Sequence, residues 1–254
     1  CSNQPVVFKN LSTINFGNIT KIEWFFNEST EANNQSYYQM VNAPISGAQY
    51  SFSYAVFHSP LTKNIAVKLR AYSGTCVAEK VMNITLKAVP QISFTPIPEV
   101  CQEQADFKIT QAKENSGFAG SATFTGRGVS SDGMFSPSSA GPGEHQITYT
   151  FTGTNGCVEV LSQSIKVNPT PIISAGENET ILLGGNAILN AVASGEDLTY
   201  SWSPATGLSN PSILNPVANP TDDITYTLTA TSAAGCVATD DVFVKVLQKP
   251  EIPD

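Results

Sequence analysis

The sequence predicts an all-β protein made of three tandem β sandwiches that follow one another as an elongated rod. Three observations support this prediction: a repeat of about 80 residues, short stretches of alternating apolar and polar residues, and proline-containing joints at the same interval. The 254 residues are 41% hydrophobic and only 13% charged, so the polar surface is mainly Ser, Thr, Asn and Gly. Such residues compete for the hydrogen bonds of a helix and favour strands and turns.

Two independent markers define the repeat. One is a cysteine shortly after a glycine and before a valine, and the other is a proline that begins a new segment. The markers are Cys76, Cys157 and Cys236, and Pro90, Pro171 and Pro250. Successive markers are 81 and then 79 residues apart in both series. We therefore expect sandwiches at 1–89, 90–169 and 170–248, with 249–254 as a linker to a further domain downstream.

Each repeat is expected to close with a β hairpin, because two period-two strands flank its glycine-cysteine turn. A short opening strand precedes the main fold of the second and third repeats, at Gln91–Phe94 and Ile172–Ala175, and the first repeat is expected to lack it. Trp24 and Trp202, with Phe124 as their counterpart, are expected in the cores. About seven strands per repeat is typical of an immunoglobulin-like sandwich. The hairpins are Ile65–Tyr72 with Val81–Ala88, Gln146–Thr152 with Leu161–Val167, and Ile224–Thr231 with Asp240–Leu247.

Cysteine placement predicts two disulfides within single repeats. Cys1 and Cys101 occupy similar positions near the start of their repeats, so the repeat favours Cys1–Cys76 and Cys101–Cys157. Each such bridge would add about 4 kcal/mol by chain entropy. Cys236 lacks a partner in its own repeat and is expected as a free, partly buried thiol. Disulfides indicate an oxidising compartment, outside the cell or on its outer surface.

Other features exclude or leave open several functions. A net charge of −8 disfavours nucleic acid, and no apolar run reaches the roughly 18 residues of a membrane-spanning helix. No set of residues resembles a catalytic triad or a zinc site, so we expect neither an enzyme nor a cofactor. Calcium stays open because carboxylates are paired in the third repeat. Sugar binding stays open because aromatic residues gather in the first. These residues are Glu196-Asp197, Asp222-Asp223 and Asp240-Asp241, and Tyr37, Tyr38 and Tyr50.

Several segments resemble repeats of Bacteroidota surface proteins. The third repeat is similar to polycystic-kidney-disease-like (PKD-like) domains, through Tyr200–Asn210, Asn215–Pro220 and Ala234–Cys236. The second resembles an Ig-like companion repeat, through Phe124–Val129 and Ala140–His145. The first is a looser PKD match, with Asn27-Glu28-Ser29 where many such domains carry Gly-Asp-Gly.

The resemblance implies a non-catalytic stalk or spacer in a large exported protein, such as a gliding-motility adhesin or another substrate of type IX secretion. Its partners would be the flanking domains of the same polypeptide, and the segment itself would be monomeric. The alternative is an adhesive module that binds carbohydrate or protein through the region Asn27–Tyr50 of the first repeat.

Overall fold

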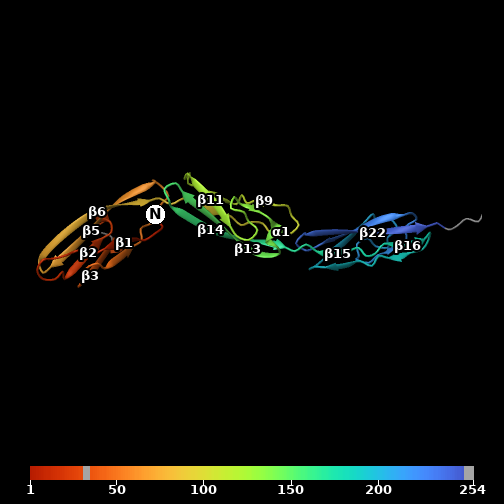
Figure 1. The fold of residues 1–254 in the computed structure, drawn as a ribbon, viewed down its shortest axis with the longest axis horizontal. Helices are drawn as coiled ribbons and strands as arrows, with labels where there is room; N and C mark the ends of the chain where they lie inside the picture. Colours follow the sequence, from red (N-terminus) through yellow and green to blue (C-terminus); the bar gives the residue numbers. More distant parts are fainter. Residues whose placement is uncertain (31–34, 249–254) are drawn as a thin grey trace, which may run out of the picture. The chain divides into compact units, whose positions relative to one another are not determined.

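A computed structural model describes residues 1–30 and 35–248 of the chain (Figure 1). Within these ranges the chain is built mainly of strands, with one short helix, α1 (Pro137–Ala140), and two 3₁₀ turns, η1 (Glu28–Thr30) and η2 (Gln35–Tyr37). The predicted linker 249–254 lies outside the described residues. None of the helical segments in the described ranges is long and apolar enough to cross a membrane.

The chain divides into two compact units. One comprises Cys1–Phe94, Ala112–Thr123 and Tyr149–Leu161, and the other comprises Thr95–Gln111, Phe124–Thr148 and Ser162–Asp254. The second sequence repeat therefore contributes residues to both units. The division into three separate domains stays a prediction.

The first repeat forms two facing sheets. The larger has the antiparallel order β3-β2-β5-β6, and the smaller pairs β1 with β4. Their inner faces enclose an aromatic core in which Phe8 lies 5.5 Å from Trp24 and 5.4 Å from Phe26, measured between ring centroids. The strands are β1 (Val6–Lys9), β2 (Lys21–Phe25), β3 (Tyr38–Asn42), β4 (Gln49–Phe52), β5 (Thr62–Ser73) and β6 (Cys76–Lys87).

The third repeat has the same plan. Its larger sheet has the order β16-β22-β21-β19, in which β16 runs parallel to β22, and the smaller pairs are β15 with β18 and β17 with β20. Tyr226, Leu228 and Val244 are fully buried between them. The strands are β15 (Ile172–Ser174), β16 (Glu179–Leu182), β17 (Ala187–Ile188), β18 (Val192–Ser194), β19 (Thr199–Ser203), β20 (Val217–Ala218), β21 (Ile224–Thr231) and β22 (Val237–Leu247).

The second repeat follows the topology of the third. Its larger sheet has the order β11-β13-β14-β8, in which β8 runs parallel to β14, and the smaller pairs are β7 with β10 and β9 with β12. The strands are β7 (Ile92–Phe94), β8 (Val100–Cys101), β9 (Phe107–Lys108), β10 (Ala112–Glu114), β11 (Gly120–Thr125), β12 (Met134–Phe135), β13 (Gly143–Gly153) and β14 (Val158–Asn168).

These sheets confirm the predicted fold class of immunoglobulin-like β sandwiches. The three closing hairpins are β5-β6, β13-β14 and β21-β22, and in each of them the second strand begins earlier in the sequence than predicted. The opening strands of the second and third repeats are β7 and β15, as predicted. Trp24, Phe124 and Trp202 are 5%, 7% and 2% exposed on the corresponding strands β2, β11 and β19, which confirms their role in the cores.

Candidate functional site: disulfide-bonded joints between repeats

The glycine-cysteine turns of the second and third repeats place a cysteine next to the last strand. Gly156 and Gly235 have φ angles of +82° and +81°, in the left-handed region that glycine adopts without a steric cost. Cys157 and Cys236 follow directly and are fully buried. Each cysteine is therefore held at the turn that faces the end of the preceding repeat.

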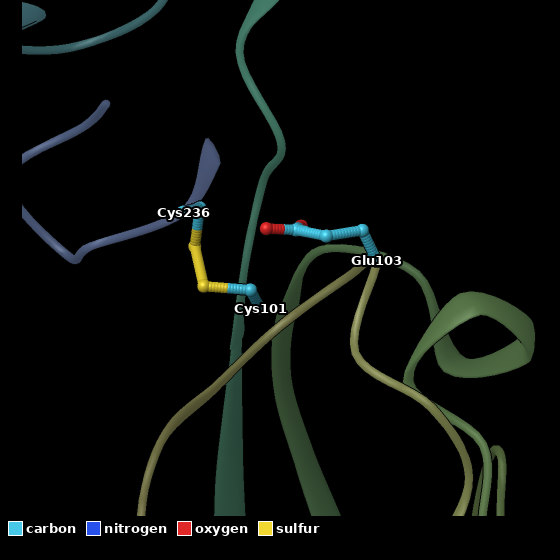
Figure 2. Close-up of side chains that lie close together, drawn as sticks. All are labelled: Cys101, Glu103 and Cys236. Carbon is cyan, nitrogen blue, oxygen red and sulfur yellow. A yellow bond between two sulfur atoms is a disulfide. The ribbon is translucent and has the colours of Figure 1, made fainter. Parts of the chain in front are cut away.

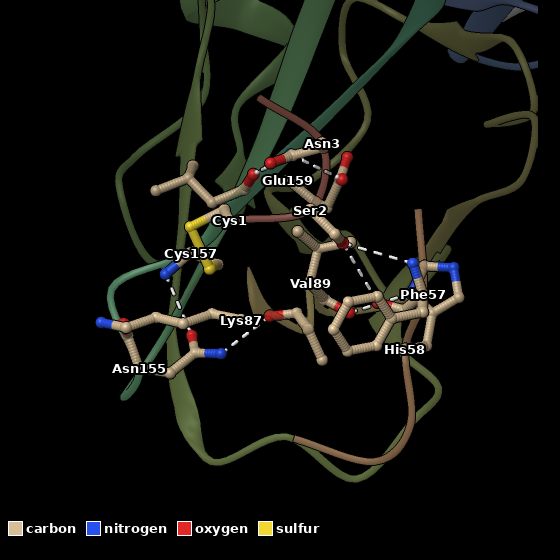
Figure 3. Close-up of a disulfide and its surroundings, with 12 residues drawn as sticks. Cys1, Ser2, Asn3, Phe57, His58, Lys87, Val89, Asn155, Cys157 and Glu159 are labelled. Atoms are coloured by element: carbon tan, nitrogen blue, oxygen red, sulfur yellow. Dashed lines mark hydrogen bonds between the residues drawn. A yellow bond between two sulfur atoms is a disulfide. The ribbon is translucent and has the colours of Figure 1, made fainter. Parts of the chain in front are cut away.

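The first joint is closed by a disulfide between Cys1 and Cys157, whose Cα atoms lie 5.6 Å apart (Figure 3). Cys1 is held at the far end of β6, because the N–H of the next residue, Ser2, donates to the carbonyl of Lys87 over 2.8 Å. The bridge connects residues 156 positions apart in the sequence. It links the end of the first repeat to the hairpin turn of the second.

Side-chain hydrogen bonds support the same joint (Figure 3). Asn3 donates through Nδ2 to the Glu159 carboxylate over 2.9 Å. In the other direction, Asn155 donates through Nδ2 to the carbonyl of Ala88 over 2.8 Å, and Lys87 Nζ donates to the carbonyl of Asn155 over 2.9 Å. These bonds orient the turn that carries Cys157 against the end of β6.

The connecting chain is itself fixed. Val89 is fully buried, its N–H donates to the carbonyl of Phe57 over 3.0 Å, and its carbonyl lies 2.9 Å from Nδ1 of His58. Pro90 follows and restricts the backbone further. His58 thus has a structural role at the joint.

The second joint repeats this arrangement (Figure 2). Cys101 and Cys236 form a disulfide with a Cα separation of 5.4 Å, across 135 sequence positions. Glu103 accepts the N–H of Val237 over 3.0 Å, and its other carboxylate oxygen accepts the hydroxyl of Thr170. Burial of Glu103 opposes ionisation, but these hydrogen bonds outweigh it and lower the pKa of its carboxyl. A charged Glu103 therefore stabilises the joint.

These bridges correct the predicted pairing. Cys1–Cys76 and Cys101–Cys157 do not form, and Cys236 is bonded instead of free. The free thiol is Cys76, which is exposed and faces Ser73 across the β5-β6 turn.

Strand length explains the correction. Cys101 lies in β8, which runs parallel to β14. In this pairing Cys101 lies beside Asn168, the last residue of β14. Cys157 directly precedes the first residue of the same strand. An 11-residue strand spans about 36 Å, whereas bridged cysteines have Cα atoms within about 7 Å. The two cysteines of one repeat are therefore at opposite ends of it, and each reaches the neighbouring repeat.

The polar residues of the joints were not predicted from the sequence. Asn3 and Glu103 each lie two residues after the first cysteine of a repeat, and each bonds a residue shortly after the cysteine of the next repeat. This shared position was a signal in the sequence. It becomes meaningful only when the bridge is known to cross the joint.

The three tyrosines proposed as ligand contacts do not form one surface. The segment Asn27–Tyr50 is not a single loop, because β3 and the start of β4 lie within it. Tyr37 packs 5.4 Å from Phe52, measured between ring centroids, and Tyr50 packs 5.7 Å from Trp24, both against the core. Tyr38 lies on the outer face of the large sheet, so the structure separates it from the other two.

That outer face carries a buried carboxylate that the sequence did not single out. Glu23 is 8% exposed and accepts hydrogen bonds from Tyr72 (2.6 Å), Lys21 (2.9 Å) and Tyr38 (3.0 Å), and Nη1 of Arg70 lies 3.5 Å from its carboxylate. Burial would raise the pKa of Glu23, but the hydrogen bonds from Tyr72, Lys21 and Tyr38 outweigh it and lower the pKa from 4.5 to about 2. Glu23 therefore ties together three strands of the sheet.

Two of the three carboxylate pairs of the third repeat, Asp222-Asp223 and Asp240-Asp241, include an aspartate that bonds to the backbone of its own repeat. Asp240 accepts the N–H of Ala175 over 2.8 Å, and Asp223 accepts the N–H of Val246 over 2.7 Å. Among the described residues, the one group of three potential ligands with atoms within 4.8 Å of one another is Cys101, Glu103 and Cys236. Its two sulfurs form a disulfide, and metal binding requires thiolates.

No family model matches the chain, and no curated protein matches it. The solved structures that are similar over 96% of the chain include the following three. Extracellular domains 3–5 of Drosophila OTK are 14% identical over 92% of their length, with a TM-score of 0.32. The insect immune protein hemolin is 13% identical over 72% of its length, with a TM-score of 0.35. Three immunoglobulin domains of titin are 10% identical over 93% of their length, with a TM-score of 0.37.

Proposed function

We propose that this chain is a non-catalytic extracellular spacer whose joints are held by disulfides between successive repeats. The observation that carries the proposal is that both bridges, Cys1–Cys157 and Cys101–Cys236, cross a joint. A bridge within one sandwich stabilises that sandwich alone. A bridge across a joint limits how far two sandwiches can separate when the chain is pulled, which is what a load-bearing spacer requires.

The polar contacts at the joints support the same function. Asn3 at the first joint and Glu103 at the second bond across the joint, beside the disulfide. Disulfides persist in oxidising surroundings, so the chain would work outside the cell. The PKD-like resemblance suggests a large surface adhesin or another exported protein of Bacteroidota as the parent, with flanking domains as partners.

Small-angle X-ray scattering of the oxidised chain and of the reduced, alkylated chain tests this proposal. We expect a narrow distribution of interatomic distances for the oxidised chain, and a broader one after reduction because the joints bend more freely. The Cys76→Ser variant is the control and should behave as the unmodified chain in both states. Identical profiles before and after reduction would show that the disulfides do not hold the joints.

A further inference from the structure

The opening strands of the second and third repeats each cover one side of their sandwich. In the second repeat, β7 pairs with β10, and Phe94 is 6% exposed with its ring 6.2 Å from that of Tyr149. In the third, β15 pairs with β18, and Ala175 beyond it is fully buried. The N–H of Ala175 donates to Asp240 on the last strand, β22.

The last strands of the first and third repeats can be aligned from their cysteines. Four residues after the cysteine stand Lys80 in β6 and Asp240 in β22, and two residues further stand Met82 and Val242. Met82 pairs with buried Val67 on the neighbouring strand, so both lie on the inner face of the sheet. Met82 is nevertheless 60% exposed, whereas Val242 is 1% exposed. The inner face of β6 is therefore open at this point.

The opening is a groove of about 290 Å³ lined by Phe8, Leu11, Trp24, Lys80 and Met82, among others. Leu11 at its edge is 69% exposed, and the same segment, which lies outside any strand, carries two more exposed apolar residues. These are Ile14 (42%) and Phe16 (90%).

The corresponding segments of the other repeats are paired. Counted from Phe8 and Phe107, which occupy equivalent places in β1 and β9, residues 13–15 correspond to β10. In the second repeat, β10 is the partner of β7. The first repeat thus has the groove and the pairing segment without the strand that fills them.

We propose that this groove accepts an extended segment of the pattern Pro-x-Ile-x-apolar as an added β strand. Pro90–Phe94 shows the pattern in the second repeat, and β7 occupies the equivalent position there. Strand addition combines main-chain hydrogen bonds with pockets for alternate side chains. In the second repeat the equivalent strand, β7, lies on the N-terminal side of Cys101. This inference is independent of the spacer function.

Methionine oxidation tests the proposal in the full chain extended ahead of Cys1 by a copy of residues 90–100. This copy places the strand at the spacing that β7 has from Cys101. Oxidation of methionine by peroxide follows exposure, so we expect Met82 to be oxidised about five-fold more slowly in the extended chain. Met40 and Met134, 50% and 38% exposed, are internal controls whose rates should not change.

The matched control carries the same extension with the Ile92→Asp and Phe94→Asp changes in the copied segment, and Met82 should there oxidise as fast as in the unextended chain. Equal Met82 rates in the two extended chains would overturn the proposal. Protection that appears in the unextended chain only as its concentration rises would also overturn it, since a second copy would then fill the groove.

Discussion

Replacing Cys101 and Cys236 together by serine is expected to lower the free energy of unfolding of the third repeat by about 4 to 5 kcal/mol. The bridge closes a loop with a sequence separation of 135, and the chain-entropy treatment gives about this value for such a loop. Fluorescence of Trp202 during denaturation with guanidinium chloride measures the change. A Trp24→Phe background makes Trp202 the sole tryptophan, because the sequence contains two.

Two further variants make this prediction specific. Replacing Cys76 by serine should leave the Trp202 transition where it is, because Cys76 is exposed and unbonded in the first repeat. Replacing Cys1 and Cys157 together should destabilise the first joint and leave the Trp202 transition nearly unchanged. Destabilisation by Cys76→Ser, with no effect of the Cys101 and Cys236 changes, would contradict the observed pairing.

Acid is expected to remove about 3 kcal/mol of stability from the first repeat through Glu23. Its pKa in the folded chain is lowered to about 2 from an ordinary value of 4.5. A lowered folded pKa stabilises the fold above the unfolded pKa, and this stabilisation is lost as the pH falls from about 4.5 to about 2. Urea unfolding followed by Trp24 fluorescence in a Trp202→Phe background, at pH 7, 4.5 and 2.5, measures the loss.

The Glu23→Gln variant is the control, because it keeps the shape of the side chain without its charge. It should be less stable than the unmodified chain at pH 7, and the difference should shrink as the pH approaches 2. Other carboxylates also titrate in this range, so the comparison between the two chains isolates Glu23. If both chains lost the same stability between pH 5 and 2, Glu23 would not be the acid-sensitive group.

The repeat and the alternating strands were sufficient to predict the sandwiches. Period-two patterns identify strands wherever one face is buried, as in Ile224–Thr231, which is observed as β21. The buried Trp24 and Trp202 were predictable because a large aromatic side chain in a small sandwich is most stable at its centre. The positions of strands and of buried tryptophans can be predicted because they depend on residues close in sequence or on the alternation of apolar and polar residues.

The cysteine partners were not predictable in the same way. The repeat shows that cysteines occupy equivalent positions, but it does not show which end of a sandwich each position occupies. Parallel pairing of β8 with β14 places Cys101 beside Asn168, far from the turn of its own repeat. This pairing depends on contacts between residues more than 60 positions apart, which strand periodicity does not encode.

The tyrosines predicted as a ligand contact do not share one surface, for a related reason. Tyr37 and Tyr38 are adjacent in sequence, but one packs against the core and the other joins Glu23 on the outer face. Neighbouring residues in or next to a strand point to opposite faces. Because a strand, and not a loop, begins at Tyr38, the adjacent residues Tyr37 and Tyr38 are expected on opposite faces and not on one surface.

Single-molecule stretching of the oxidised chain between its two ends tests whether the disulfides connect successive repeats. With the observed bridges, the taut chain passes from Cys157 back to Cys101 and then from Cys236 to the C-terminus, about 75 residues or about 27 nm. Reduction should lengthen it to about 91 nm. A fully stretched oxidised length of about 44 nm is what Cys1–Cys76 and Cys101–Cys157 bridges would give. That length would contradict the claim that the disulfides hold successive repeats together.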